Sequence, residues 1–384
     1  MLKIGIRHNL VYPTTFISLL LLRRIVKLSL ERFINIEGPF IFTMSMFLLE
    51  FLIGMIFILS DSKKGIKLRT QNKISNSNDS TKKIMFLLFS AAFFEFYGCV
   101  VRRYFFEEFN ENVSENFHDR FRSLEIIIAS ILCYFTIRLR IYRHHLVSLI
   151  IIGICLLLML IIEFIFFNDN MSVLKGFCVV FVSSVCKVYL DVIEKYLFEV
   201  NYINLFSMMI IENSFDLILS LILIFGILEQ PIKEIKDLYE NSSVSFVVVI
   251  ILILVYAILS AIKNIYRRYT VKFYSPMTRS MAESILDPFF LIYDSFLGKN
   301  KYDLNEKLFY IIFSIILSII MIFLSLVYNE FIIVYLCGLE HNTHLEIGKR
   351  MDNFETIAYS SFSQASLELS DETSSFSMNN SFYL

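Results

Sequence analysis

Long apolar runs separated by short polar segments dominate this chain of 384 residues. A membrane-spanning helix needs about 20 mostly apolar residues. The apolar residues follow one another without alternation, which indicates helices rather than the strands of a membrane barrel. Nine runs reach or approach the required length: 39–59, 84–101, 121–137, 145–167, 173–196, 204–228, 246–263, 274–296 and 308–336.

A tenth run, Tyr12–Leu30, is weaker. It is apolar as far as Leu22 and then carries Arg23, Arg24 and Lys27. It is either a poor first span or an interfacial amphipathic helix. It lacks the small-residue cleavage site of a secretory signal peptide. We therefore expect an all-α polytopic membrane protein with about ten transmembrane helices.

The composition agrees with a membrane protein. The chain is 56% hydrophobic and has 40 Phe, against about 45–50% apolar residues in soluble domains. This excess of apolar side chains belongs in the lipid bilayer. The net charge of −1 gives no field that would attract nucleic acid. The six cysteines lie mostly inside apolar runs and have no metal-site spacing, so we predict neither a metal nor a cofactor.

Basic residues between the runs predict the orientation. The segments 60–83, 138–145 and 263–272 are rich in Lys and Arg and fall on one side if every run crosses once. The positive-inside rule places that side in the cytosol, and the C-terminus with it. The intervening segments are neutral or acidic and contain glycosylation sequons at Asn112, Asn170 and Asn241. These features fit an endomembrane of the Golgi or endoplasmic reticulum, or the plasma membrane.

Four parts of the chain follow from this pattern. They are an N-terminal segment with the weak span (1–38), a first transmembrane half (39–167), a second half (173–336) and a cytosolic tail (337–384). The tail is acidic and rich in Ser and has no periodicity, so we expect it to be disordered. It is either a target of phosphorylation or a passive tail.

An internal repeat links the two halves. "RSLEIIIASILCYFTI" (Arg122–Ile137) and "RSMAESILDPFFLIYD" (Arg279–Asp294) both begin Arg-Ser and are the penultimate run of their half. Five spans in each half would invert the second repeat relative to the first. Inverted repeats are a transporter architecture in which the substrate site lies near the midplane.

Four stretches in this order resemble the drug/metabolite transporter superfamily, in its solute-carrier branch that includes nucleotide-sugar transporters. "EGPFIFTMSMFLLEFLIG" (37–54) is similar to that branch's second span, and residues 122–159 to its fourth and fifth. "VCKVYLDVIEKYLFEVNYINLFSMMIIENSFDLILSL" (185–221) is similar to the sixth and seventh spans, and "YSPMTRSMAESI" (274–285) to the ninth. The resemblance covers about residues 37–336.

The resemblance implies two inverted five-helix halves and alternating access around a central cavity. It also implies cavity-lining residues on the seventh and ninth spans, here Glu212, Asn213, Thr278 and Arg279. One position departs from the nucleotide-sugar carriers. Several of them have a lysine in the fourth span where this chain has Glu125, and a carboxylate there would repel a phosphate-bearing substrate.

Charged residues inside the runs share helix faces. Arg279, Glu283 and Asp287 are four apart, so Arg279 can pair with Glu283 or snorkel to the cytosol. Asp287 precedes Pro288, which cannot donate to the carbonyl of Ser284. The freed carbonyl beside a carboxylate predicts a local cation or proton site, or a hinge.

Two other runs show the same spacing. Lys187, Asp191 and Lys195 are four apart, as are Glu212 and Asp216. An intrahelical Asp191–Lys195 pair is expected, with the deeper Lys187 left as a substrate contact. Glu212 and Asp216 should either meet a cation, such as Lys187 or Arg279, or carry a proton.

These observations predict an alternating-access transporter of a small polar or charged metabolite, either nucleotide-sugar-like or proton-coupled. No catalytic motif occurs, so we do not expect an enzyme. The alternative is a non-transporting receptor or scaffold built on the carrier fold. The substrate is open, and so is the oligomeric state, for which a homodimer is one alternative. The residues expected to line the cavity are Glu125, Lys187, Glu212, Asn213, Asp216, Thr278, Arg279, Glu283 and Asp287.

Overall fold

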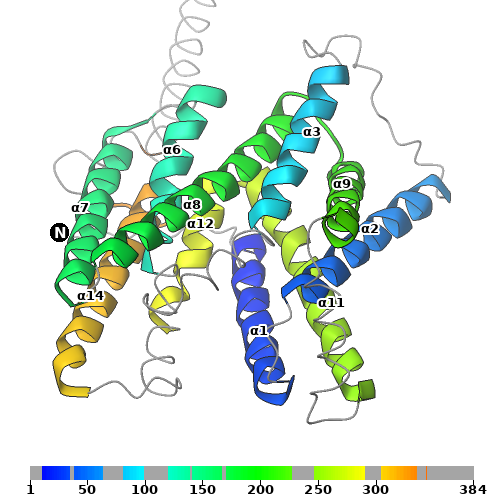
Figure 1. Ribbon diagram of the computed structural model, residues 1–384. Coiled ribbons are helices and arrows are strands. Elements are labelled where there is room, and N and C mark those ends of the chain that lie inside the picture. The colour runs from blue at the N-terminus through cyan, green and yellow to red at the C-terminus, as the bar shows by residue number, and fades with distance from the viewer. Residues whose placement is uncertain are drawn as a thin grey trace, which may run out of the picture.

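The computed structural model describes residues 11–34, 39–63, 81–98, 120–138, 141–166, 170–226, 246–289, 304–334 and 343. All regular structure in these residues is helical (Figure 1). The helices are α1 (Val11–Ile34), α2 (Pro39–Lys63), α3 (Thr81–Phe96), α6 (Leu124–Thr136), α7 (Arg143–Phe166), α8 (Asn170–Glu199), α9 (Leu205–Gly226), α11 (Phe246–Phe273), α12 (Pro276–Ser284) and α14 (Leu304–Tyr328).

Six of these helices are long and apolar enough to cross a membrane, namely α2, α7, α8, α9, α11 and α14. Helix α6 is apolar but shorter. The prediction of an all-α, multi-pass membrane protein is confirmed at this level. Helix α1 is outside the six, and it packs against α11 through Tyr12, which stacks on Tyr269 and Phe273.

Large apolar side chains are exposed in stripes on the outside of the helices. On α7 they recur every three or four residues, the spacing of one helix face: Ile150, Ile154, Leu157, Ile161 and Ile165 are each at least 44% exposed. Exposed apolar faces of this extent need an apolar surrounding. Lipid supplies it.

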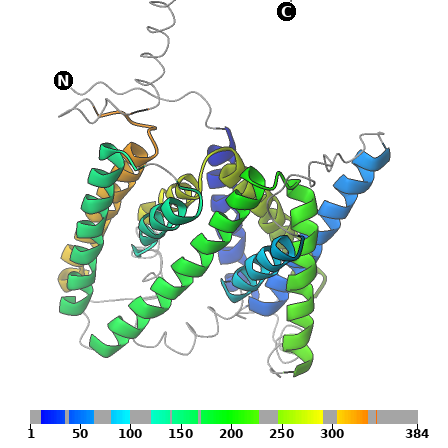
Figure 2. The same cartoon turned by 90° about the horizontal axis from the view of Figure 1, so that it is seen from above.

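Helix α8 runs diagonally across the molecule and connects its two sides (Figures 1 and 2). It packs against α3, α6, α7, α11 and α12, and it is the most buried of the six candidate spans. The pair α7 and α14 lies on one side of it, and α2, α3 and α9 lie on the other. The polar side chains on the middle of α8 therefore lie among helices from both halves of the chain.

Two predicted runs differ most from the helices observed. The run 246–263 continues to Phe273 as one helix, α11, through the segment that we expected to be a basic loop. The run 274–296 begins with the short α12, which a turn at residues 285–286 interrupts. The turn falls where Pro288 cannot donate to the carbonyl of Ser284. Residues 290–303, the segments 64–80, 99–119 and 227–245, and the predicted tail apart from Thr343 lie outside the described residues.

Candidate functional site

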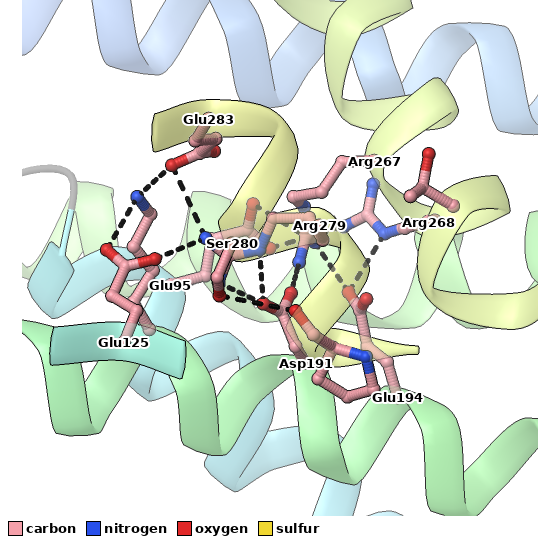
Figure 3. Close-up of polar contacts among 12 residues, drawn as sticks. Glu95, Glu125, Asp191, Glu194, Arg267, Arg268, Arg279, Ser280 and Glu283 are labelled. Carbon is pink, nitrogen blue, oxygen red and sulfur yellow. Dashed lines mark hydrogen bonds and ion pairs between the residues drawn. The ribbon is translucent and has the colours of Figure 1, made fainter. Parts of the chain in front are cut away.

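Charged side chains from seven of the described helices form one connected network of ion pairs, and Figure 3 shows its central part. Ion pairs inside an apolar bundle are expensive because both partners lose their hydration. The network therefore marks the place where this protein departs most from simple apolar packing. Two hubs organise it, Arg279 on α12 and the pair Arg267 and Arg268 on α11.

Arg279 joins both halves of the chain. The N-cap Ser275 accepts a hydrogen bond from the Thr278 amide at 3.0 Å and fixes the start of α12. Arg279 is fully buried one turn later. Its Nη1 lies 2.6 Å from Glu125 Oε2, and its Nε donates to Asp191 Oδ2 at 2.5 Å. Nη1 also lies 3.3 Å from Glu283 Oε2, so the expected pair within α12 forms as part of a larger cluster.

Lys187 completes this hub and is its most exposed member. Its Nζ donates to Glu125 Oε1 at 3.1 Å and also to Glu283 Oε2. The Lys187 side chain is 27% exposed, whereas Glu125 and Arg279 are fully buried. Lys187 is therefore the position where this cluster is accessible from outside.

The second hub binds carboxylates from four other helices. Arg268 Nη1 lies 2.8 Å from Glu50 Oε2, and Nη2 lies 3.2 Å from both Glu95 Oε2 and Glu212 Oε2. Its Nε lies 3.2 Å from Glu194 Oε1. A guanidinium carries five donors in one plane, which is why one arginine can serve these four acids.

Arg267 connects the two hubs. Its Nη1 lies 2.5 Å from Asp191 Oδ1, and its Nη2 lies 2.6 Å from Glu194 Oε1. Asp191 also accepts from Arg279, so Asp191 is shared between the hubs.

Sequence reasoning missed the two arginines of the second hub, although it named Glu212. It predicts Arg267 and Arg268 in a basic loop, which is wrong because both are buried in the helix α11. One signal was available: Ser260, Asn264 and Arg268 are four apart and buried, so a polar face extends the apolar run. Asn264 donates to Glu50 Oε1 at 2.6 Å along this face.

Glu212, Asp216 and Asn213 are buried on α9. The cation that meets Glu212 is Arg268, not Lys187 or Arg279 as expected. The other oxygen of Glu212, Oε1, is buried and makes no hydrogen bond among the described residues. Asp216 is fully buried one turn further on, and Asn213 donates to the carbonyl of Met209 within the helix at 2.7 Å.

Asp287 and Thr278 contact residues next to the ends of other helices, Arg122 before α6 and Asn329 after α14. Asp287 Oδ1 lies 2.9 Å from Nη1 of Arg122, which also donates to the Glu283 carbonyl at 3.3 Å. Thr278 Oγ1 donates to Asn329 Oδ1 at 2.8 Å, a contact between α12 and the end of α14. Asp287 thus joins the network through Arg122, whereas Thr278 packs beside it.

The expected ladder on α8 is arranged differently. Asp191 pairs with Arg267 and Arg279 rather than with Lys195. Lys195 instead donates to the carbonyls of Lys272 and Tyr274 at 2.9 and 3.0 Å. Those carbonyls lie at and just after the C-terminus of α11. The last carbonyls of a helix receive no hydrogen bond from backbone amides of the same helix, so Lys195 supplies the donor.

Glu163, a buried acid outside the network, has its own partners. Glu163 on α7 accepts from Arg120 and from the Tyr310 hydroxyl, each at 2.5 Å.

The three carboxylates of Glu95, Glu194 and Glu212 converge closely enough to hold a metal ion, but Arg268 contacts all three. An organic cation of the protein itself thus occupies that position.

The network carries more acids than bases. It contains five cationic side chains and eight carboxylates: Arg122, Lys187, Arg267, Arg268 and Arg279, against Glu50, Glu95, Glu125, Asp191, Glu194, Glu212, Glu283 and Asp287. Lys263 and Asp216 are buried as well. An excess of buried carboxylates is unfavourable in a low dielectric, so this set of described residues favours bound protons or a further cation.

The comparisons with known proteins give no family. The chain has no match among protein-family models and no significant match among curated proteins.

Proposed function

We propose that this protein is an alternating-access transporter of a small polar or charged metabolite, related in architecture to the drug/metabolite transporter superfamily. The observation that carries the proposal is the buried network. It ties α2, α3 and α6 of the first half to α8, α9, α11 and α12 of the second. Ionisable groups inside a membrane bundle mark ion or substrate pathways more often than they stabilise a fold.

The pattern of helix packing supports two inverted five-helix halves. Pairing α1, α2, α3, α6 and α7 with α8, α9, α11, α12 and α14 relates most of the helix contacts to one another, although the contacts α8–α11, α11–α12, α8–α12 and α7–α8 have no counterpart of similar extent among the described residues. Under this pairing the α1–α11 contact corresponds to α8–α3, the α2–α11 contact to α9–α3, and the α6–α8 contact to α12–α1. The contacts α2–α9, α6–α12 and α7–α14 correspond to themselves, as expected on a pseudo-two-fold axis.

The two Arg-Ser starts support the same symmetry. Arg122 of the first half lies 2.9 Å from Asp287 of the second. Arg279 of the second half lies 2.6 Å from Glu125 of the first. Each repeat therefore contributes an arginine to the carboxylates of the other, at the interface where carriers of this architecture bind substrate.

The charge surplus supports proton coupling and a cationic or zwitterionic substrate. Glu212 faces Arg268 from α11, Glu95 from α3 and Glu194 from α8. Its Oε1 makes no hydrogen bond among the described residues, so Glu212 is the acid that we assign to the proton. Both cations of the Arg279 hub are already matched by carboxylates, which disfavours a phosphate-bearing solute.

Uptake into proteoliposomes tests the proposal. The panel consists of amines, amino acids, vitamins, sugar phosphates and nucleotide sugars, with and without an inward proton gradient. We expect the gradient to stimulate uptake of a cationic or zwitterionic solute, and Glu212→Gln to remove this stimulation because an amide does not exchange protons. Asp287→Asn should reduce uptake at least about tenfold, or about 1.4 kcal/mol, without loss of folded protein.

Glu199→Gln is the matched control, because Glu199 is 45% exposed and lies outside the network. Gradient-stimulated uptake by Glu212→Gln equal to that of the unmodified protein would contradict proton coupling through this residue.

The alternative function is a receptor or scaffold on the carrier fold. Each arginine of the two hubs is paired with carboxylates of the protein itself. Such ion pairs are able to hold helices in place without any role in transport. Binding of a panel solute without uptake, in protein that is folded and correctly inserted, would favour this alternative.

The proposal includes the orientation and the compartment: a cytosolic C-terminus, in the membrane of the Golgi or endoplasmic reticulum or in the plasma membrane. The segment 263–272 no longer supports this orientation because its arginines are buried.

A further inference from the structure

Two adjacent histidines meet a glutamate at one end of the α7–α14 pair, away from the charge network. His144 and His145 lie in the first turn of α7, and Glu330 follows the end of α14. One side-chain ligand atom from each lies within 4.8 Å of the other two. All three are buried, with 3%, 8% and 8% of their surfaces exposed.

His144 has no hydrogen bond among the described residues through either ring nitrogen. Its Nε2 lies 3.2 Å from Glu330 Oε1, but the contact lacks hydrogen-bond geometry. A buried imidazole without hydrogen bonds is unfavourable. Zinc–nitrogen and zinc–oxygen bonds of about 2.0–2.2 Å in a tetrahedron place neighbouring ligand atoms about 3.3–3.5 Å apart. The observed separation therefore suits two ligands of one ion.

The backbone at Glu330 indicates that its side chain is needed there. Glu330 has a φ of 58°, in the left-handed region. The Phe331 amide donates to the Leu326 carbonyl and the Glu330 amide to the Val327 carbonyl, the bonds of a Schellman motif at a helix end. Glycine is the usual residue at this position because it has no Cβ. Glutamate is less favourable there, so the carboxylate needs its own explanation.

We propose that His144, His145 and Glu330 bind a divalent transition metal ion, with zinc preferred. Two imidazoles and one carboxylate form a borderline nitrogen and oxygen donor set, which suits zinc better than calcium or magnesium. His145 Nδ1 accepts from the Tyr142 amide at 3.2 Å. The bound ion links the start of α7 to the end of α14, and it does so whether or not the protein transports a solute.

Cobalt binding to the full-length protein tests this site. The protein is purified in detergent without a histidine tag and titrated with Co²⁺, whose visible absorption reports tetrahedral coordination, and then with Zn²⁺ in competition. We expect one equivalent of Co²⁺ to bind and Zn²⁺ to displace it. His144→Ala should weaken binding at least about 100-fold, because losing a ligand exceeds the 10–100-fold effect of losing an outer-shell partner.

A second variant separates metal binding from folding. Glu330→Gly places the preferred residue at a left-handed position, so the variant should fold at least as well as the unmodified protein while metal affinity falls by a similar factor. The control is the double variant His341→Ala and His344→Ala, which removes two histidines of the predicted tail and should leave affinity unchanged. Unchanged metal affinity in Glu330→Gly, or no saturable Co²⁺ spectrum in the unmodified protein, would overturn the proposal and leave a His144–Glu330 ion pair.

Discussion

Arg268 is the residue on which the acids of four helices converge. It is fully buried, and its guanidinium contacts Glu50, Glu95, Glu194 and Glu212. Removing one partner from a buried ion pair is more damaging than replacing both, because the remaining charge keeps its desolvation cost. At the residue scale, the stability of the second hub thus depends on a side chain that the sequence placed in a loop.

Substitution of Arg268 tests this dependence. Arg268→Met should lower the free energy of unfolding by about 3–5 kcal/mol, and adding Glu212→Gln should recover part of the loss by removing one unmatched charge. Thermal unfolding in detergent measures both. Lys82→Met, at an exposed position of α3, is the control. A melting temperature for Arg268→Met equal to that of the control would show that Arg268 does not hold the hub together.

Helices α2 and α9 pack closely against each other at Gly54. A Cβ added to Gly54 on α2 would lie 2.8 Å from Ile210 Cγ1 and 3.3 Å from Met209 Cε, both on α9. A Cβ added to Gly153 on α7 would meet only Ile127 Cδ1, at 3.9 Å. Small residues let membrane helices approach closely. Gly54 therefore permits the contact between the second helix of each proposed half.

The two glycines form a matched pair for substitution. Gly153→Ala should be neutral or stabilising by up to about 1 kcal/mol, because alanine favours the helix. Gly54→Ala should lose about 1–3 kcal/mol through overpacking, and Ile210→Ala in the same chain should relieve part of that loss. The measurement is the unfolding of the unmodified protein and of these three variants under identical detergent conditions. Equal stability of Gly54→Ala and Gly153→Ala would contradict the close approach.

The whole molecule is held together by reciprocal contacts between its halves. Arg122 reaches Asp287, and Arg279 reaches Glu125. These residues lie on elements far apart in the chain and close together in space. If the halves move against each other during transport, the two ion pairs sit at the moving interface.

A double-mutant cycle measures the coupling across this interface. Arg122→Ala and Asp287→Ala should each destabilise the protein, and together by less than the sum. We expect an interaction energy within the 0.5–3 kcal/mol typical of residues in contact. Arg122→Ala combined with Glu199→Gln should be additive, because Glu199 pairs with Lys195 instead. Additivity of Arg122→Ala and Asp287→Ala would exclude the cross-half pair.

Element positions followed closely from the sequence, because the bilayer imposes a length and an apolarity that are readable locally. The run 145–167 became α7 (Arg143–Phe166), and 204–228 became α9 (Leu205–Gly226). The failures have a common cause. A basic segment is read as a loop when its charges are assumed to face water, yet Arg267 and Arg268 are neutralised by acids from other helices.

Composition and spacing along the chain are enough to predict an all-helical membrane protein and the helix faces that carry Arg279, Glu283 and Lys187, since spacing along one helix fixes which residues share a face. The partners of the buried charges follow from the folded structure alone: Asp191 between Arg267 and Arg279, Glu212 against Arg268, and Asp287 against Arg122. The folded structure also decided that His144 is buried beside Glu330. Such partners lie on different helices, and no local pattern records which helices will meet.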